Sequence, residues 1–252
     1  ATLPLMLHLP GMTFTRAYSA SPLCSPTRSS ILVGQYPART GITAPVCHLP
    51  TVQLEKSLGK NENGKVRVLV ADSVTRLKPA YFTLAEAFKE AGYATAHFGK
   101  WHLGQNLKAG DTYEPRDQGF DLDWPHTPSA PGPGNSYLAP WKFIKDPTIT
   151  DEVGVNIEDR MSKEAAKYIA AHKAKPFYLN YWAFSVHGPW NARADYIEYF
   201  KSKADPKNPQ TAARMSTAFE TWPRYDADRQ ALIRAELERI MAAPGLSRDL
   251  GE

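Results

Sequence analysis

The segment TLAEAFKEAGYATAHFGKWHLG, residues 83 to 104, contains a complete helix–strand unit. Thr83 and Glu86 have the spacing of a capping box, and the apolar residues that follow recur at helical spacing. The pattern predicts a helix over 83–91, ended by a glycine, and then a short strand over 93–98. A polar loop follows the strand directly, which is where chemistry is expected in such a unit.

A second unit repeats this order later in the chain. Apolar residues at helical spacing over 157–169 predict another helix, and the run FYLNYWAFSV, residues 177–186, predicts a fully buried strand. The alternation indicates an α/β fold. In open α/β sheets ligands bind beyond the carboxyl ends of the strands, so we expect Lys100, His102 and His187 to lie at one edge of a single sheet.

Bulk composition limits the classes of protein that fit. The 252 residues are 42% hydrophobic and 22% charged, which is typical of a globular chain with one sizeable core. Two cysteines are too few for a disulfide-built scaffold. The net charge of +4 comes from mixed signs without a basic run, so it favours a mild attraction for anions over a nucleic-acid platform. We predict no partner nucleic acid and no association with a membrane.

The ends of the chain and its long loop carry less information. No apolar stretch reaches the roughly 20 residues that a bilayer span needs. The start, ATLPLMLHLPGM, lacks a basic n-region and is a poor secretory signal, so the location in the cell is not readable from the residues. The segment HTPSAPGPGNSYLAP, residues 126–140, is rich in proline and glycine and is predicted to form a wall of a cleft.

The stretch SPLCSPTRSSILVG, residues 21–34, places a cysteine among polar residues and prolines. Pro26 suits a first helical turn, so Cys24 is expected at a helix N-terminus, where unpaired N–H groups favour an anion. Arg28, one turn along, adds a guanidinium that can hold an oxyanion. A thiol in this field has a lowered pKa and would be reactive; a disulfide with Cys47 is the alternative.

Three segments resemble signatures of the sulfatase family. CSPTR followed by SSILVG looks like the first signature, in which a maturation enzyme oxidises the cysteine to formylglycine. GYATAHFGKWHLG, residues 92–104, is similar to the second, and WAFSVHGPW, residues 182–190, resembles a third active-site segment. The resemblance covers roughly residues 12–208. It implies an alkaline-phosphatase-like α/β core and a sulfuric ester hydrolase of the arylsulfatase kind that uses a calcium ion.

The resemblance also implies a role for each site residue. Cys24, as formylglycine, would be a metal ligand and, once hydrated to a gem-diol, would attack the sulfur of the ester. Arg28 would steady the hydrate, and His102 would handle the proton at the diol. Lys100 and His187 would hold the sulfate oxygens. The expected partners are a small-molecule or saccharide sulfate ester and a formylglycine-generating enzyme, and family members are commonly periplasmic or secreted.

The sequence departs from the family in its carboxylates. Sulfatases carry an Asp-Asp pair upstream of the cysteine and an Asp-Asn or Asp-His pair later, both for the metal. Residues 1–54 contain no acidic residue, and no Asp precedes Asn or His. Calcium takes about six to eight oxygen ligands, so the carboxylate ligands are missing from this sequence. The late active-site lysine has no counterpart, and the core is expected to be incomplete.

The last part of the chain is similar to a different family. Residues 208–252 resemble the C-terminal helices of bacterial aminopeptidase N, without a HExxH zinc motif, so no peptidase activity follows. Asp226 as a cap and the apolar residues Ile233, Leu237, Ile240 and Met241 predict an amphipathic helix. We therefore expect a partial sulfatase domain over 1–207 and an unrelated helical tail over 208–252, as in a truncated or spliced reading frame.

Three functions stay open at this point. The first is a sulfatase, which the missing carboxylates predict to turn over little or not at all in this chain. The second is a non-catalytic sulfatase-like remnant that binds anionic ligands, and the third is a phosphate or phosphonate ester hydrolase of the same fold.

Single residues also have simpler interpretations. His48 and His126 are left as structural or substrate-side residues, and one aromatic set is expected to pack in the core or line a pocket: Trp124, Tyr137, Trp141, Trp182 and Trp190.

Overall fold

The structure is a computed structural model of residues 1–252. It describes residues 18–59, 68–129, 132–134, 136–144, 146, 149–151 and 153–201, together with positions 227, 230, 231, 234, 235, 238, 239 and 242. The chain divides into two compact units, Ala1–Asn191 and Ala192–Glu252. All the predicted site residues belong to the first unit.

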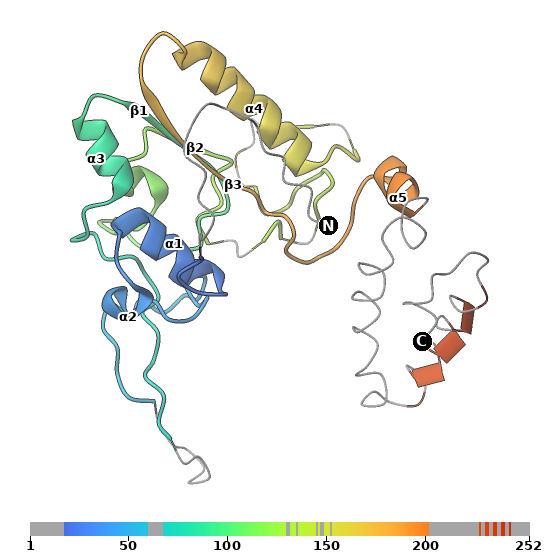
Figure 1. Ribbon diagram of the computed structural model, residues 1–252, viewed down its shortest axis with the longest axis horizontal. Helices are drawn as coiled ribbons and strands as arrows, with labels where there is room; N and C mark the ends of the chain where they lie inside the picture. The colour runs from blue at the N-terminus through green and yellow to red at the C-terminus, as the bar shows by residue number, and fades with distance from the viewer. Residues whose placement is uncertain are drawn as a thin grey trace. The chain divides into compact units, whose positions relative to one another are not determined.

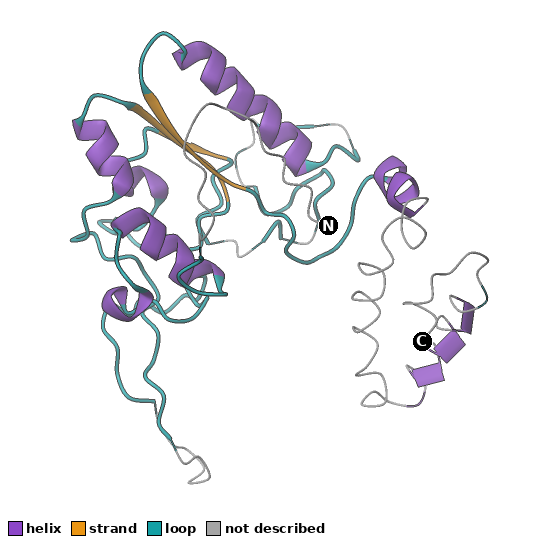
Figure 2. Ribbon diagram, in the orientation of Figure 1, coloured by secondary structure: helices purple, strands orange, loops and turns teal. Residues whose placement is uncertain are grey.

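The first unit is built on a parallel sheet of three described strands in the order β2-β1-β3. Strand β1 is Ala94–Gly99, β2 is Leu122–Trp124 and β3 is Phe177–Trp182. The central strand pairs along its full length with β3, from Ala94 opposite Phe177 to Gly99 opposite Trp182. The sheet runs between helices on its two sides (Figures 1 and 2), which confirms the predicted α/β class.

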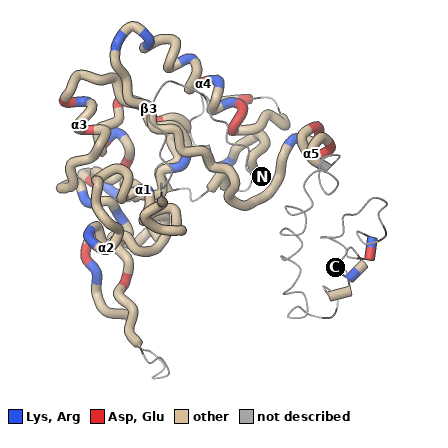
Figure 3. The backbone as a smooth tube through the Cα atoms, viewed as in Figure 1, with Lys and Arg blue, Asp and Glu red and all other residues tan. Residues whose placement is uncertain are grey.

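One face of the sheet packs on helix α4, Ile157–His172. Ala96 and Phe98 of β1 both point to this side, because alternate residues of a strand face the same way. They pack in one buried cluster with Ile157 and Met161. The Asn156 side chain caps the helix by accepting from the Glu158 N–H at 2.8 Å. Acidic residues lie at the start of α4 and basic residues along its later turns (Figure 3), which suits the helix dipole.

The opposite face packs on helices α1, Cys24–Val33, and α3, Leu84–Glu90. The predicted capping box of α3 is present: Thr83 Oγ1 accepts from the Glu86 N–H at 3.2 Å, and Glu86 Oε2 accepts from the Thr83 N–H at 2.7 Å. Helix α1 begins at Cys24 and ends before Gly34, whose φ of 63° is left-handed. Both helices therefore form where the sequence predicts them.

Short elements complete the described chain. Helix α2 is Pro37–Thr40, the 3₁₀ turn η1 is Pro115–Gln118, and helix α5, Ala194–Lys201, belongs to the second unit. In the tail, the described positions from 227 to 239 are helical, while the predicted cap Asp226 and the four apolar positions named for its face lie outside the described residues. Within the described part of the chain, no helix is long and apolar enough to cross a membrane.

Two details of the predicted strands were wrong. The second strand ends at Trp182 and not near residue 186, and of its six residues only Asn180 is buried, while Tyr181 is 38% exposed. Because β3 has a described neighbour on one side only, its cover is thinner than that of β1, where five of six residues are buried. The apolar run continues past Trp182 because Phe184 packs in the core from a loop.

Candidate active site

The site forms where the chain leaves the central strand. The Lys100 N–H donates to the Trp182 carbonyl at 2.8 Å, which extends the pairing of β1 and β3 by one residue. His102 then adopts a φ of 57°, a left-handed conformation that is uncommon for a residue with a side chain. The turn places residues 100–102 just beyond the carboxyl end of β1, which is where ligand-binding residues of α/β folds are expected.

Cys24 meets this turn from the N-terminus of α1. Its Sγ lies 3.3 Å from His102 Nδ1, and it is close enough to Lys100 to raise the pKa of that ammonium. The neighbouring Ser25 hydroxyl donates to the His102 carbonyl at 2.7 Å, and the His102 N–H donates to the Pro128 carbonyl at 3.3 Å. The two predicted signatures are therefore joined through one thiol and one imidazole.

Arg28 supports the same turn from the next part of α1. Its Nη1 donates to the Lys100 carbonyl at 2.6 Å, and its guanidinium stacks over the Trp182 ring at 4.6 Å from the ring centre. Burial lowers the pKa of Arg28 to about 10, partly offset by Cys24, so the group is protonated at neutral pH. Its Nε is buried without a partner, so Arg28 keeps one donor available.

Burial sets the charge states at the centre of the site. Lys100 is only 4% exposed, and burial lowers its pKa, an effect that Cys24 opposes and Arg28 reinforces. His102 is 1% exposed, and burial with the nearby charges of Lys100, His48, Arg28 and His187 lowers its pKa to about 3. A neutral imidazole thus lies beside the thiol, with two cationic side chains nearby.

His187 lies in the loop after β3 and is exposed. Its Nδ1 lies 2.8 Å from the Gly188 carbonyl, and a Cβ placed on Gly132 would lie 2.4 Å from that nitrogen. The proline- and glycine-rich loop therefore packs closely against His187, which is near enough to contribute to the lowered pKa of His102. The structure shows no contact between His187 and Cys24, so its predicted role at the sulfate stays a prediction.

A cavity of about 440 Å³ opens beside the thiol. Its walls come from the segment before α1, from the exposed side of α1 and from the end of β3. The lining residues are Ser19, Ser21, Pro22, Leu23, Cys24, Thr27, Arg28, Ile31 and Trp182. A ligand in this space would meet Cys24 and the Arg28 side chain.

Comparison with known proteins identifies this arrangement. The family model "Sulfatase" matches residues 4–234. The chain belongs to the sulfatase family. The match runs past residue 207, where the sequence suggests that the sulfatase-like part ends. Membership confirms the resemblance carried by the three signatures.

Individual sulfatases cover different parts of the chain. An arylsulfatase of Hemicentrotus pulcherrimus is 35% identical over 114 residues, 44% of this chain and 17% of that protein. The N-acetylgalactosamine-6-sulfatase of Mus musculus is 29% identical over 204 residues, 74% of this chain and 35% of that protein. The chain thus spans about a third or less of the length of these relatives.

A solved structure supports the fold. The crystal structure of Ps i-CgsB in complex with k-i-k-neocarrahexaose superposes with a TM-score of 0.52 at 21% identity. The superposition covers 88% of this chain and 46% of that one. At this identity the likeness concerns the fold, and it agrees with a partial alkaline-phosphatase-like sulfatase core.

The residues around Cys24 do not fit the calcium ion usual for sulfatases. The side chains that contact or flank the thiol are Lys100, His102 and Arg28, which present nitrogen atoms, whereas calcium prefers carboxylate and carbonyl oxygens. In the described parts of the chain, no three His, Cys, Asp or Glu side chains are grouped so that they could hold a metal ion.

Several simpler interpretations can now be compared with the structure. Cys24 and Cys47 are both free, so the alternative of a disulfide was wrong. Tyr137 and Trp141 pack in the core, as the simpler interpretation of the aromatic set predicts. Trp190 is 88% exposed, so it does not pack in the core, and it does not line the cavity beside Cys24. Trp182 is the member of that set that lines the sulfatase cavity.

His48 is a site residue that sequence reasoning left unassigned. Its Nδ1 lies 2.9 Å from His102 Nε2, and the two ring centres are 5.2 Å apart. No pattern in residues 42–50 distinguishes this histidine from a surface one. The contact joins residues 54 positions apart, so only the folded sulfatase core reveals it.

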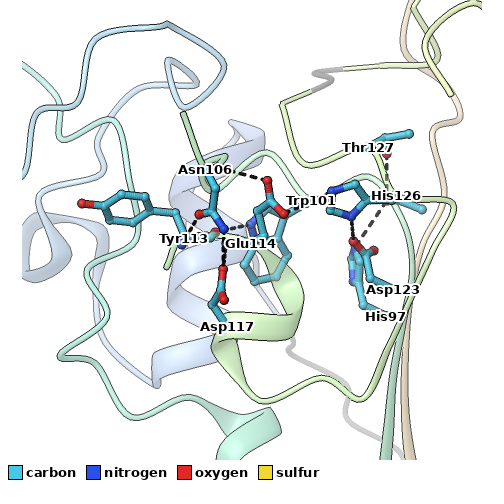
Figure 4. A network of polar contacts seen from close by, with 10 residues as sticks. His97, Trp101, Asn106, Tyr113, Glu114, Asp117, Asp123, His126 and Thr127 are labelled. Carbon is cyan, nitrogen blue, oxygen red and sulfur yellow. Dashed lines mark hydrogen bonds and ion pairs between the residues drawn. The ribbon is translucent and has the colours of Figure 1, made fainter. Parts of the chain in front are cut away.

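His126 has a structural role in the network of polar contacts that Figure 4 shows. Its Nδ1 lies 2.5 Å from an oxygen of the buried Asp123, and its Nε2 lies 3.1 Å from Glu114. The next residue, Thr127, donates to the Gly99 carbonyl at 3.4 Å, and Pro128 accepts from the His102 backbone. The ion pairs therefore hold the loop that supports His102, which favours the structural interpretation of His126.

The ion pairs of His126 predict how the stability of the protein changes with pH. Hydrogen bonds that His126 donates to the Asp123 and Glu114 carboxylates raise its pKa from 6.5 to about 10. A raised pKa in the folded state means that the stabilisation is complete below pH 6.5 and is lost as the pH rises through about 10. We expect His126→Gln to lower the melting temperature at neutral pH, by an amount that shrinks towards alkaline pH. Because His126 is partly exposed, the loss should be about 1 kcal/mol or less.

Thermal unfolding of the wild type and His126→Gln across this range measures the effect. Subtracting the melting temperatures of the two proteins at each pH removes the effect of the tyrosines and lysines, which titrate in both. A difference that stays constant from neutral pH to pH 10 would show that the charge on His126 does not hold this loop.

Proposed function

We propose that this site hydrolyses sulfate esters, with residue 24 as the nucleophile after conversion of Cys24 to formylglycine. The observation that carries the proposal is the meeting of Cys24, at the first turn of α1, with His102 and Lys100. Cys24 also stands in the Cys-x-Pro-x-Arg pattern that the maturation enzyme would read. The related proteins named above are both sulfatases.

Each neighbouring side chain has a distinct task in this proposal. Formylglycine supplies a hydroxyl nucleophile when hydrated and releases sulfate by re-forming its aldehyde. The proton of that hydroxyl goes to His102 Nδ1, which lies 3.3 Å from the Sγ that marks the position of the nucleophile. Neutral His102 can accept it, because burial and nearby cations keep the ring unprotonated.

The cations stabilise the negative charge that grows on the transferring group. The Lys100 ammonium lies beside residue 24, and Arg28 fixes the Lys100 backbone while keeping its own charge at the cavity. His187 is proposed to complete the set from the opposite loop, at a sulfate oxygen or the leaving oxygen. The backbone N–H groups at the start of α1 add a favourable dipole.

The substrate class follows from the relatives and the cavity. Arylsulfatase and N-acetylgalactosamine-6-sulfatase are named for an aryl and a saccharide sulfate ester, so we propose a small-molecule or saccharide sulfate ester here. The wall formed by Leu23, Ile31 and Trp182 suits an apolar or ring-shaped alcohol part. The cysteine motif favours sulfate over the phosphate and phosphonate esters that remain the alternative.

We also propose that residues 1–252 by themselves turn over little or no substrate. The sulfatase family uses calcium, and the described residues around Cys24 offer it no carboxylate. A site with cations alone would bind the sulfate group, yet it would lack the ion that normally acts on the nucleophile and the sulfate.

Mass spectrometry of the peptide containing residue 24 is the first test, after co-expression with a formylglycine-generating enzyme. The same sample is assayed on an aryl sulfate and an aryl phosphate, with and without calcium. We expect conversion of Cys24 with little or no turnover, and no modification in Cys24→Ala. An unconverted Cys24, beside a control motif peptide that is converted, would contradict the formylglycine proposal. Robust calcium-dependent hydrolysis would contradict the proposed lack of turnover.

The same cations favour a second candidate function, the binding of an anionic ligand without turnover. Arg28 lines the cavity, Lys100 and neutral His102 lie next to the thiol, and none of the described residues that line the cavity carries a carboxylate. Sulfate binding by the unconverted protein separates this function from a purely structural role.

A further inference from the structure

His48 contacts the buried face of the catalytic imidazole. Its Nδ1 is 2.9 Å from His102 Nε2, on the side of the ring opposite the nitrogen that faces Cys24. His48 itself is exposed, whereas His102 is 1% exposed. The pair therefore connects the interior of the site to the surface through two imidazole rings.

A buried arginine fixes the loop that carries His48. Arg76 is fully buried, and its Nη1 donates to the Cys47 carbonyl at 3.1 Å while its Nη2 donates to the Leu49 carbonyl at 2.7 Å. The two accepted hydrogen bonds lie on either side of His48 in the sequence. Charge-assisted bonds of this kind restrict the backbone strongly, so the position of the His48 ring is set in advance.

The contacts of Cys24 determine the direction of the hydrogen bonds. A thiol has one proton to donate, and the neighbouring Lys100 ammonium has donors only and cannot accept it. With the thiol as donor to His102 Nδ1 at 3.3 Å, that atom is the unprotonated nitrogen of the ring. In the neutral tautomer the single ring proton is therefore on Nε2, which faces His48 Nδ1.

We propose that His48 is a positioning residue that holds His102 in the tautomer with its proton on Nε2. By accepting that proton in a hydrogen bond, His48 keeps His102 Nδ1 free to accept from residue 24. Without such an acceptor, the proton of His102 would distribute over both nitrogens, and the tautomer with a proton on Nδ1 cannot act as a base there. The catalytic consequence rests on the proposed sulfatase function, whereas the tautomer itself does not.

The relay also gives a balanced path for one proton. When residue 24 gives its hydroxyl proton to His102 Nδ1, His102 can give its Nε2 proton to His48 Nδ1. His48, being exposed, passes a proton to water. His102 thus returns to a neutral ring beside Lys100, and no second positive charge has to persist there.

Nitrogen-15 NMR of the ring nitrogens in the unconverted protein, labelled on histidine, tests the proposal without any activity measurement. The signals of His102 are assigned by their loss in His102→Gln. We expect the wild type to show the tautomer with the proton on Nε2 almost alone. In His48→Ala the shifts should move to those of a tautomer mixture, with a large part of the population protonated on Nδ1.

Two further variants make the result specific. His48→Gln offers an amide oxygen as acceptor and should largely restore the wild-type shifts, which a loss of packing would not allow. His172→Gln removes a histidine whose Nδ1 contacts the Tyr168 carbonyl and should leave the His102 shifts unchanged. The proposal is overturned if wild-type His102 carries its proton on Nδ1, or if His48→Ala leaves its shifts unchanged. Failure of Cys24 conversion would overturn the proposed function alone, because the tautomer is read in the thiol form.

Discussion

Gly99→Ala is expected to lower the free energy of unfolding of the first unit by roughly 2 to 6 kcal/mol, a large part of the stability of an ordinary domain. Gly99 ends β1 with a φ of 95°, where residues with a side chain are strained. An added Cβ would lie 2.2 Å from the Trp182 carbonyl oxygen and 3.1 Å from Met161 Sδ. Neither the paired backbone nor the core around Met161 can move away without disturbing the sheet.

The same change should disturb the site, because the affected carbonyl accepts from the Lys100 N–H at 2.8 Å. If β1 and β3 separate at this point, Lys100 and the turn at His102 lose their common support. Urea unfolding followed by circular dichroism measures the stability, and the exchange rate of the Lys100 amide reports the local pairing.

Gly92→Ala is the matched control. Gly92 has a φ of 83°, and nothing lies within 4 Å of an added Cβ, so this variant carries the backbone strain without the clash. Its expected loss is about 1 kcal/mol. If Gly99→Ala is as stable as Gly92→Ala, the close approach of β1 to Trp182 does not restrict the sheet as we infer.

The parts of the fold that the sequence predicts are those with local causes. The capping box at Thr83, the glycine after α1 and the helical spacing of α4 act between residues a few positions apart. Strand ends were less accurate, because they depend on which neighbours cover them. The predicted end of β3 was wrong for that reason, since Phe184 belongs to the loop after the strand and is nevertheless buried in the core.

The candidate site divides in the same way. Cys24, Lys100 and His102 stand in signatures whose spacing reflects a helix N-terminus and a strand end, and the structure brings these three together. His48 and the support of its loop by Arg76 depend on contacts between segments 27 to 54 residues apart. Residue types alone carry no signal for such pairings, so Arg76 and His48 could not be connected before the fold was known.

Lys100→Met is expected to reduce the affinity of the unconverted protein for sulfate by about ten-fold to a hundred-fold, or roughly 1.5 to 3 kcal/mol. The variant keeps much of the volume of the side chain and removes a charge that lies beside Cys24. Because Lys100 is 4% exposed, removing its charge also removes a desolvation cost. We therefore expect the melting temperature to stay the same or rise while the affinity falls.

A sulfate affinity that falls while the melting temperature stays the same or rises would separate a binding role of Lys100 from a structural one. Isothermal titration with sulfate, at an ionic strength kept constant with chloride, gives the affinity, and thermal unfolding of the same samples gives the stability. Lys108→Met is the control, because Lys108 is exposed in the loop beyond the second signature and its loss should leave sulfate binding nearly unchanged. Burial lowers the pKa of Lys100 below 10.5, so sulfate binding by the wild type should weaken at a lower pH than an ordinary lysine would give. Equal sulfate affinity in the wild type and Lys100→Met would contradict this role, since an anion held beside Cys24 must respond to the buried positive charge of Lys100.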